Sequence, residues 1–273
     1  FRIDDLSNQG VGTGPVNEPV RGIGDWQASP NRGADYASAN LLSSMAPVFI
    51  GAPNFAEAGF DAPTRAYRNF APGVRWIAHE AVHRWAAHLR LRDSQSGDIE
   101  SLVVDPCQCH WNHYLHAPVV HPVRSEYTDA PYVEASVMGG DVWVDNGDGT
   151  FTGTDDSYHL PKGLSALDLY VMGMIPASDV PDTFILRDVQ HTGVPRTVRA
   201  TKVPVRISDI VDAMGPREPP ARSSRKEFRL GIYLLHLPDR SVDQESLERA
   251  QGVAKAIGEY FDEATGGRMR VIP

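Results

Sequence analysis

The sequence predicts an α+β protein in which a mixed β-sheet packs on a buried helix and a C-terminal helix closes the other side. Three observations predict this fold class. An apolar segment without Gly or Pro runs from Val74 to Leu91, alternating runs occupy residues 142–152 and 183–209, and an amphipathic segment covers Ser241 to Ala264. Helical and strand patterns thus alternate along a single chain that is long enough to build a core.

The buried helix is expected directly after Pro72-Gly73, which interrupts the chain. Apolar residues between Val74 and Leu91 fall on nearly every face of a helix, and a helix that is apolar all round is a buried one. Within it the chain reads His79-Glu80-Ala81-Val82-His83, the H-E-x-x-H motif.

The spacing of this motif predicts a zinc site. Residues four apart lie on one helix face, so His79 and His83 can bind one Zn2+ ion as metal ligands. Glu80 lies about 100° round the helix from His79, beside the metal, where a carboxylate can accept a proton from zinc-bound water. The alternative is a structural cluster in which buried polar side chains satisfy one another.

Before this helix, residues 1–33 predict an irregular segment with a possible edge strand at Arg2 to Leu6. Residues 34–44 predict a short helix or a loop, and residues 45–51 predict a strand. After the helix, a loop over residues 105–125 is rich in histidines and aromatic residues. These are either ordinary surface and core residues or the lining of a site: His110, Trp111, His113, Tyr114, His116 and His121.

The two cysteines, Cys107 and Cys109, are separated by one residue and cannot connect distant parts of the fold. Reduced thiols, a local disulfide and a contribution to a metal site are all open.

Residues 141–152 predict a β-hairpin, because strand alternation surrounds Asn146-Gly147-Asp148-Gly149. The aspartate spacing also resembles a calcium loop, but no Glu stands at the twelfth position, and Asn-Gly and Asp-Gly are turn sequences by themselves.

Residues 163–176 predict a second helix, capped by Ser165 and stopped by Pro176. Asp168 is a lone carboxylate among apolar residues and needs a partner, for which a metal cation or a helix cap are the alternatives.

The C-terminal third predicts antiparallel strands over residues 183–209, with Pro204 indicating an edge strand. Residues 214–225 predict a linking loop, and residues 228–237 a strand or a buried helix. We expect a catalytic domain over residues 1–215 and a C-terminal strand and helix, residues 216–273, packed on the same domain. The final helix is expected to end at Gly266-Gly267.

A catalytic zinc site needs a third protein ligand. Asp168 is the stronger candidate, because it is a lone carboxylate in an apolar helical stretch, and His110 is the alternative. The pattern H-E-x-x-H-x-x-G-x-x-H is absent, because Ala86 and Leu89 stand where it requires Gly and His. In the predicted reaction, zinc-bound water activated by Glu80 attacks a peptide carbonyl, and His110 or Tyr170 donates a hydrogen bond to the oxyanion.

The stretch Ser165-Ala-Leu-Asp168-Leu-Tyr170-Val-Met-Gly173 resembles the segment that delivers an acidic ligand in gluzincins and aspzincins, although Tyr170 follows Asp168 by two positions rather than three. The chain also resembles a group of bacterial secreted or surface proteins. The shared features are H-E-x-x-H-R-W at residues 79–85, His110-Trp111, the hairpin at residues 147–151 and the stretch 167–173. This resemblance implies a zincin-like fold, zinc metalloendopeptidase activity and a secreted or cell-surface location.

The expected partner is a protein or peptide substrate. A net charge of −9 argues against nucleic acid, and no apolar run is long enough for a membrane span. A hydrolase of a non-peptide amide or ester, and a zinc-stabilised binding module without turnover, are the alternative functions. The oligomeric state is open.

Overall fold

The computed structural model describes residues 72–82, 85, 89–92, 97–100, 103, 110–123, 134–154, 163–231 and 241–272. The backbone of Glu80 belongs to this part of the chain but its side chain does not, and His83 lies outside it. The elements predicted before residue 72 and both cysteines also lie outside the described residues.

A mixed six-stranded sheet has the strand order β4-β3-β7-β8-β6-β5. Its strands are β3 (Trp111–His116), β4 (Gly139–Asp141), β5 (Trp143–Asp145), β6 (Thr150–Gly153), β7 (Thr183–His191) and β8 (Thr197–Val205). Strands β3 and β4 are parallel, whereas the other neighbouring pairs are antiparallel. Two short pairs stand apart from this sheet: β1 (Leu91–Arg92) with β2 (Ile99–Glu100), and β9 (Glu227–Arg229) with β10 (Arg270–Ile272).

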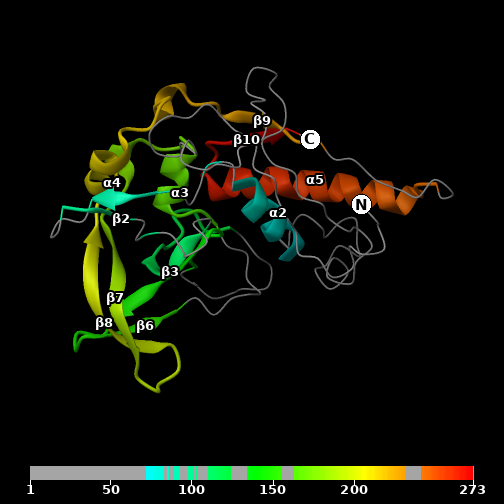
Figure 1. Cartoon of the computed structure of the whole chain (residues 1–273). Helices are drawn as coiled ribbons and strands as arrows, with labels where there is room; N and C mark the ends of the chain where they lie inside the picture. Colours follow the sequence, from blue (N-terminus) through cyan, green and yellow to red (C-terminus); the bar gives the residue numbers. More distant parts are fainter. Residues whose placement is uncertain are drawn as a thin grey trace.

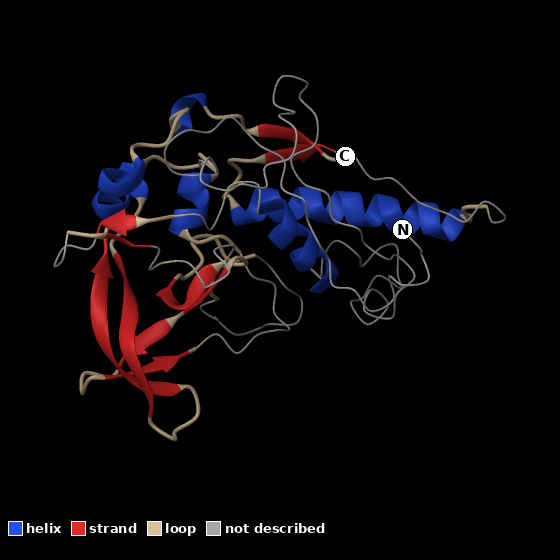
Figure 2. Ribbon diagram, in the orientation of Figure 1, coloured by secondary structure: helices blue, strands red, loops and turns tan. Residues whose placement is uncertain are grey.

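The helices gather at one end of the sheet, as Figure 2 shows in blue. They are α2 (Pro72–Val82), α3 (Ala166–Val171), α4 (Ile207–Met214) and α5 (Gln244–Ala264), with short 3-10 turns η5 (Ala177–Asp179) and η6 (Ala221–Ser223). Helix α2, which contains residues His79 to Val82 of the motif, contacts the long C-terminal helix α5 (Figure 1). The α+β prediction and the C-terminal helix are therefore confirmed. The first helix is confirmed only in its N-terminal part, because α2 ends at Val82, Trp85 lies in a turn and Leu91 begins strand β1. None of the described helices has the length and apolar character needed to cross a bilayer.

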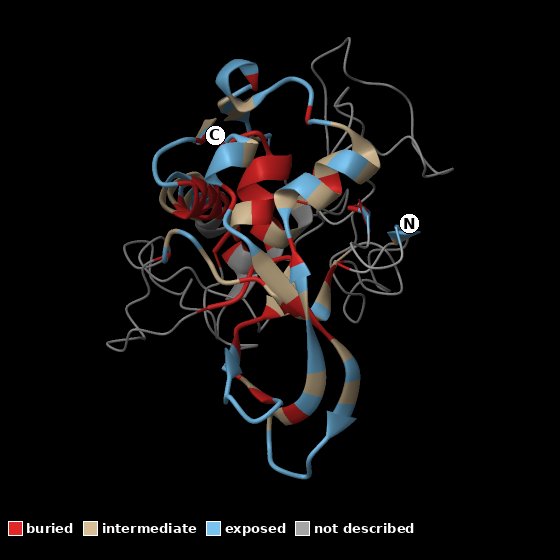
Figure 3. Cartoon of the chain, turned by 90° about the vertical axis from the view of Figure 1, so that its left-hand side faces the viewer, coloured by how far each residue is buried: buried red, intermediate tan, exposed pale blue. Residues whose placement is uncertain are grey.

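One large hydrophobic core joins the helices to the upper part of the sheet. It includes Val74 and Val82 of α2, Leu169 of α3, and Ile257 and Phe261 of α5. Figure 3 shows buried residues concentrated around the helices, while the far end of the β7–β8 pair is largely exposed. The core-facing side of α5 agrees with the predicted apolar face except at its first member, since Leu247 is 41% exposed.

The predicted hairpin is confirmed by antiparallel pairing of β5 with β6. In the turn, the Asp145 carboxylate accepts a hydrogen bond from the Gly147 amide at 3.0 Å, and Asp148 accepts one from the Thr150 amide at 2.9 Å. The two aspartates thus serve the turn, as Asp commonly does. These bonds support the turn interpretation over the calcium loop.

Two sequence expectations about strands are wrong. Pro204 was expected to mark an edge strand, but β8 lies between β7 and β6. The proline is tolerated because β6 pairs only with Thr197, Val198 and Arg199, so Pro204 lies beyond the reach of that neighbour. The histidine-rich segment was expected to be a loop, but residues 111–116 form the interior strand β3, whose apolar Trp111 and Leu115 are buried.

The predicted loop over residues 214–225 is confirmed in part, because Met214 still belongs to α4 and η6 interrupts the loop, and it packs on α3. Arg217 is buried, and its Nε donates a hydrogen bond to the carbonyl of Val171 at 2.7 Å. Helix α3 itself ends at Val171, earlier than Pro176 predicts, and Gly173 follows with a φ of +73°. A left-handed residue at this position terminates the helix before the proline is reached.

Candidate metal site

The first half of the candidate site is His79, on helix α2. Its Nδ1 lies 2.8 Å from the carbonyl oxygen of Val137. A carbonyl oxygen only accepts, so Nδ1 carries the proton and donates it. In the neutral ring, Nε2 is then the unprotonated nitrogen that can accept a hydrogen bond or bind a metal, which is the arrangement found in histidines that bind metals.

The second half is His110, directly before strand β3. Its Nε2 lies 3.1 Å from Nε2 of His79, and the two partly buried rings stack with centroids 4.9 Å apart and an interplanar angle of 23°. The structure therefore brings together two histidines that the sequence analysis proposed separately, one as a motif ligand and one as a candidate third ligand.

The distance between these two nitrogens fits a shared zinc ion. Two nitrogen ligands at Zn–N distances of about 2.0–2.1 Å in a tetrahedral arrangement lie about 3.3 Å apart. The observed 3.1 Å differs by only a few tenths of an ångström. The same distance is also suitable for a hydrogen bond from one imidazole to the other.

The remaining motif side chains, those of Glu80 and His83, lie outside the described side chains, as do Cys107 and Cys109. Among the described side chains, no group of three or more His, Cys, Asp or Glu residues is arranged to hold a metal. The predicted roles of His83 as ligand and Glu80 as base stay predictions.

Asp168, the other candidate for the third ligand, is fully buried and receives four hydrogen bonds. Its Oδ1 accepts from the Trp111 indole at 2.7 Å. Its Oδ2 accepts from the Ser136 hydroxyl at 2.5 Å, and from the amide and the hydroxyl of Ser165 at 2.7 Å each. Burial raises the pKa of this carboxyl, while the hydrogen bonds act in the opposite direction.

The local reason for this position of Asp168 is a capping box. Ser165 is the N-cap of α3, and its hydroxyl accepts from the Asp168 amide at 3.3 Å while the Asp168 side chain returns to the Ser165 amide. The capping role is the sequence-based alternative to a metal ligand for Asp168, and the geometry agrees with it.

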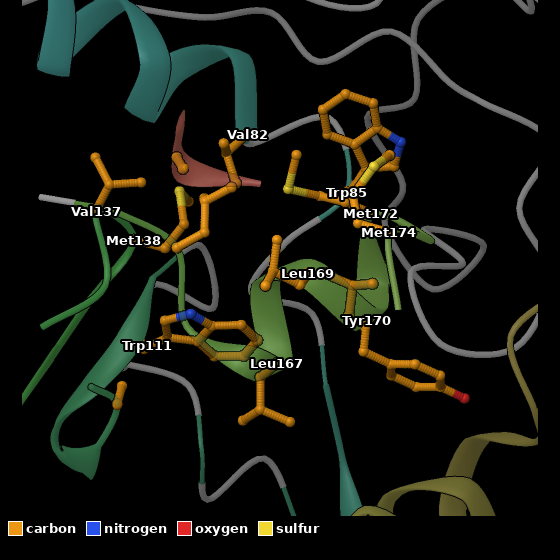
Figure 4. Close-up of a cluster of buried hydrophobic side chains, with 14 of the residues drawn as sticks. Val82, Trp85, Trp111, Val137, Met138, Leu167, Leu169, Tyr170, Met172 and Met174 are labelled. Atoms are coloured by element: carbon orange, nitrogen blue, oxygen red, sulfur yellow. The ribbon is translucent and has the colours of Figure 1, made fainter. Parts of the chain in front are cut away.

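Tyr170, a predicted oxyanion donor, is buried and accepts a hydrogen bond from the Arg217 amide at 3.3 Å. Figure 4 shows its hydroxyl directed away from Trp111 and Val137, the residues next to the histidine pair. The described geometry therefore does not bring Tyr170 to the candidate site.

The other histidines of the cluster are dispersed. His113 is exposed on β3, His116 stacks on Phe184 with ring centroids 4.6 Å apart, and His121 lies 3.0 Å from an Arg268 nitrogen. Burial lowers the pKa of His116, and the charge of Lys202 lowers it further. Only His110 of this cluster thus joins the H-E-x-x-H motif.

Sequence reasoning missed Val137 and Ser136, which lie between the predicted hairpin and the histidine segment. Val137 contributes a backbone carbonyl, so its side chain carries no signal of the role. Ser136 is fully buried and its hydroxyl contacts Asp168, but a lone serine in an apolar run is common. Comparison of the chain with family models, with curated proteins and with solved structures gives no match.

Proposed function

We propose that the protein is a zinc-dependent metallopeptidase of the zincin type, with His79, His83 and His110 as the metal ligands and Glu80 as the general base. The single observation that carries the proposal is the approach of two imidazole Nε2 atoms to 3.1 Å, one of them from the H-E-x-x-H motif. The spacing of His83 from His79, four residues along the same sequence motif, supports His83 as the remaining ligand.

The hydrogen bond at Nδ1 of His79 is a second, independent support. A ligating histidine usually donates its other ring N–H to a carbonyl or a carboxylate, which fixes the ring orientation and the tautomer. His79 makes this contact with the Val137 carbonyl.

His110 is favoured over Asp168 as third ligand because of what each side chain already contacts. An ionised carboxylate offers about four lone-pair positions, and four donors already reach that of Asp168. Three of these donors reach Oδ2 and one reaches Oδ1, so a metal at Oδ2 would displace at least one donor, and a buried donor left unsatisfied costs about 1–3 kcal/mol. The Nε2 atom of His110, by contrast, already lies 3.1 Å from that of His79.

Zinc, when bound, supplies Lewis acidity that polarises a substrate carbonyl and acidifies water. The residues of the chain do the rest. The three histidine ligands would fix the position of the reacting centre, and Glu80, one residue after His79 on α2, would take a proton from the attacking water and return it to the leaving amine. A nitrogen of His110 that binds the metal cannot also donate a hydrogen bond to the oxyanion.

The test is elemental analysis combined with a peptide-library digest. We expect stoichiometric zinc in the wild type, loss of zinc in His79→Ala and His110→Ala, and retained zinc in His113→Ala, which changes an exposed histidine on the same strand. Glu80→Gln should keep the metal and lose hydrolysis, because glutamine cannot accept the proton.

Other outcomes separate the alternatives. Zinc without turnover, together with no effect of Glu80→Gln on any measured property, indicates a binding module. Hydrolysis of amide or ester substrates but not of peptides indicates a different hydrolase. A wild type without stoichiometric zinc refutes the metal site and leaves the histidine pair as a hydrogen-bonded contact.

A further inference from the structure

We infer that Asp168 is a positioning residue. Its buried carboxylate contacts Ser136 and Trp111, and through them it connects the backbone segment that orients His79 with the segment that contains His110. Any role of Asp168 in zinc binding and catalysis rests on the proposed function. The geometry is independent of any metal, because each contact is made between groups of the chain itself.

On one side, the carboxylate holds the segment of His110. Trp111, the next residue, is 2% exposed, and its indole N–H donates to Asp168 Oδ1 at 2.7 Å. The Trp111 amide also donates to the Met138 carbonyl at 2.9 Å. The backbone immediately after His110 is therefore fixed at two points, which limits where its imidazole can lie.

On the other side, the carboxylate holds the carbonyl that orients His79. The Ser136 hydroxyl donates to Asp168 Oδ2 at 2.5 Å and accepts from the Met138 amide at 2.9 Å. Val137 lies between these two residues, and its carbonyl oxygen receives His79 Nδ1 at 2.8 Å. The hydrogen bond between the Met138 amide and the Ser136 hydroxyl thus spans Val137, whose carbonyl oxygen accepts from His79.

The carboxylate can hold both segments because it is itself rigid. Asp168 occupies the third position of α3, where Ser165 donates twice to it, and its neighbours Leu167 and Leu169 lie in the core (Figure 4). One buried group thus connects α3, β3 and the segment before β4. Functional groups need to be held to within about 0.5 Å, and a rigid connection of this kind provides it.

The test measures zinc affinity by chelator competition in the folded, metal-free protein. Ser136→Ala removes the contact to Asp168 and should weaken zinc binding by about tenfold, as loss of a group that supports a metal ligand does. Trp111→Phe removes the indole N–H that contacts Asp168 Oδ1 but keeps an aromatic side chain, and it should weaken zinc binding similarly. Neither change touches a proposed ligand.

Ser224→Ala is the matched control. Ser224 is also buried, and its hydroxyl accepts from the Arg217 guanidinium at 2.6 Å, but it has no contact with Asp168. It should lower the stability while changing zinc affinity by less than about twofold. Equal affinities in Ser136→Ala and Ser224→Ala would overturn the inference, whereas a wild type that binds no zinc would overturn the proposed function instead.

Nitrogen-15 NMR of the histidine rings tests the inference even without metal. The wild type should show the Nδ1–H tautomer of His79. Ser136→Ala should shift the His79 and His110 ring nitrogens, while Ser224→Ala should leave them unchanged. Identical ring spectra in wild type and Ser136→Ala would show that Asp168 acts on stability alone.

Discussion

Ser165→Ala is the perturbation whose effect on stability the structure defines best. Ser165 is 3% exposed and makes two different side-chain contacts with Asp168. Its hydroxyl donates to the carboxylate at 2.7 Å, and it accepts from the Asp168 amide at 3.3 Å. The substitution removes both contacts but leaves the backbone amide of residue 165, which makes its own hydrogen bond to the carboxylate at 2.7 Å.

The expected loss of unfolding free energy is about 2–3.5 kcal/mol. Loss of a helix N-cap costs about 0.5–2 kcal/mol, and the long 3.3 Å contact places this cap at the lower end. Loss of a hydrogen bond to a charged group contributes about 1.5–3 kcal/mol more. The buried site gives water no easy access to replace the missing hydroxyl.

Urea denaturation followed by circular dichroism at neutral pH measures this loss. Ser178→Ala is the control, because Ser178 also donates to a neighbouring aspartate, Asp179, at 3.0 Å, but at an exposed position. We expect it to change the free energy of unfolding by less than about 0.5 kcal/mol. A loss below about 1 kcal/mol for Ser165→Ala, or equal losses in the two variants, would refute the reasoning about the capping box.

Two further predictions concern a glycine and a histidine. Gly173→Ala should lower the free energy of unfolding by more than about 3 kcal/mol, because a Cβ would lie 2.3 Å from the Ser224 hydroxyl and 2.6 Å from Arg217 Cζ. The control Gly193→Ala, where the backbone is also left-handed but no atom lies within 4 Å of the added Cβ, should lower it by only about 1–2 kcal/mol. Thermal or urea unfolding measures both losses. His116, whose pKa is lowered from about 6.5, favours folding when neutral, so its contribution is complete above pH 6.5 and is lost as the pH falls through the lower folded-state pKa. The difference between the urea midpoints at pH 7.5 and about 5.5 should therefore be larger in the wild type than in His116→Asn. The control His191→Asn, which changes an exposed histidine, should keep the wild-type difference.

The elements that sequence reasoning located correctly have strong local signals. The hairpin turn at Asn146-Gly147 and the C-terminal helix ending before Gly266 depend on nearby residues alone. The sequence did not predict strand β3, because polar residues such as Asn112 and His113 interrupt the alternation of apolar and polar residues that is typical of a strand. Strand order could not be foreseen either, because the position of Pro204 depends on how far β6 extends along β8.

The candidate site shows the same division. The motif itself contains His79 and His83, and sequence spacing is sufficient to pair them. For the third ligand the sequence favours Asp168, a lone carboxylate in an apolar segment, over His110, but residue type does not decide this choice. It depends on contacts from Trp111, Ser136 and Ser165, which lie in separate segments and meet at the carboxylate only in the folded chain.

The contacts of His79 also bear on the order of folding. Its partners lie 31 and 58 residues further along the chain, at His110 and Val137. Closing loops of this length costs entropy that no local contact repays, so the pair forms only once the segment leading to β4 has docked. Before that stage the two histidines are not held at a fixed distance from each other. The affinity for zinc should therefore rise as tertiary structure forms during refolding.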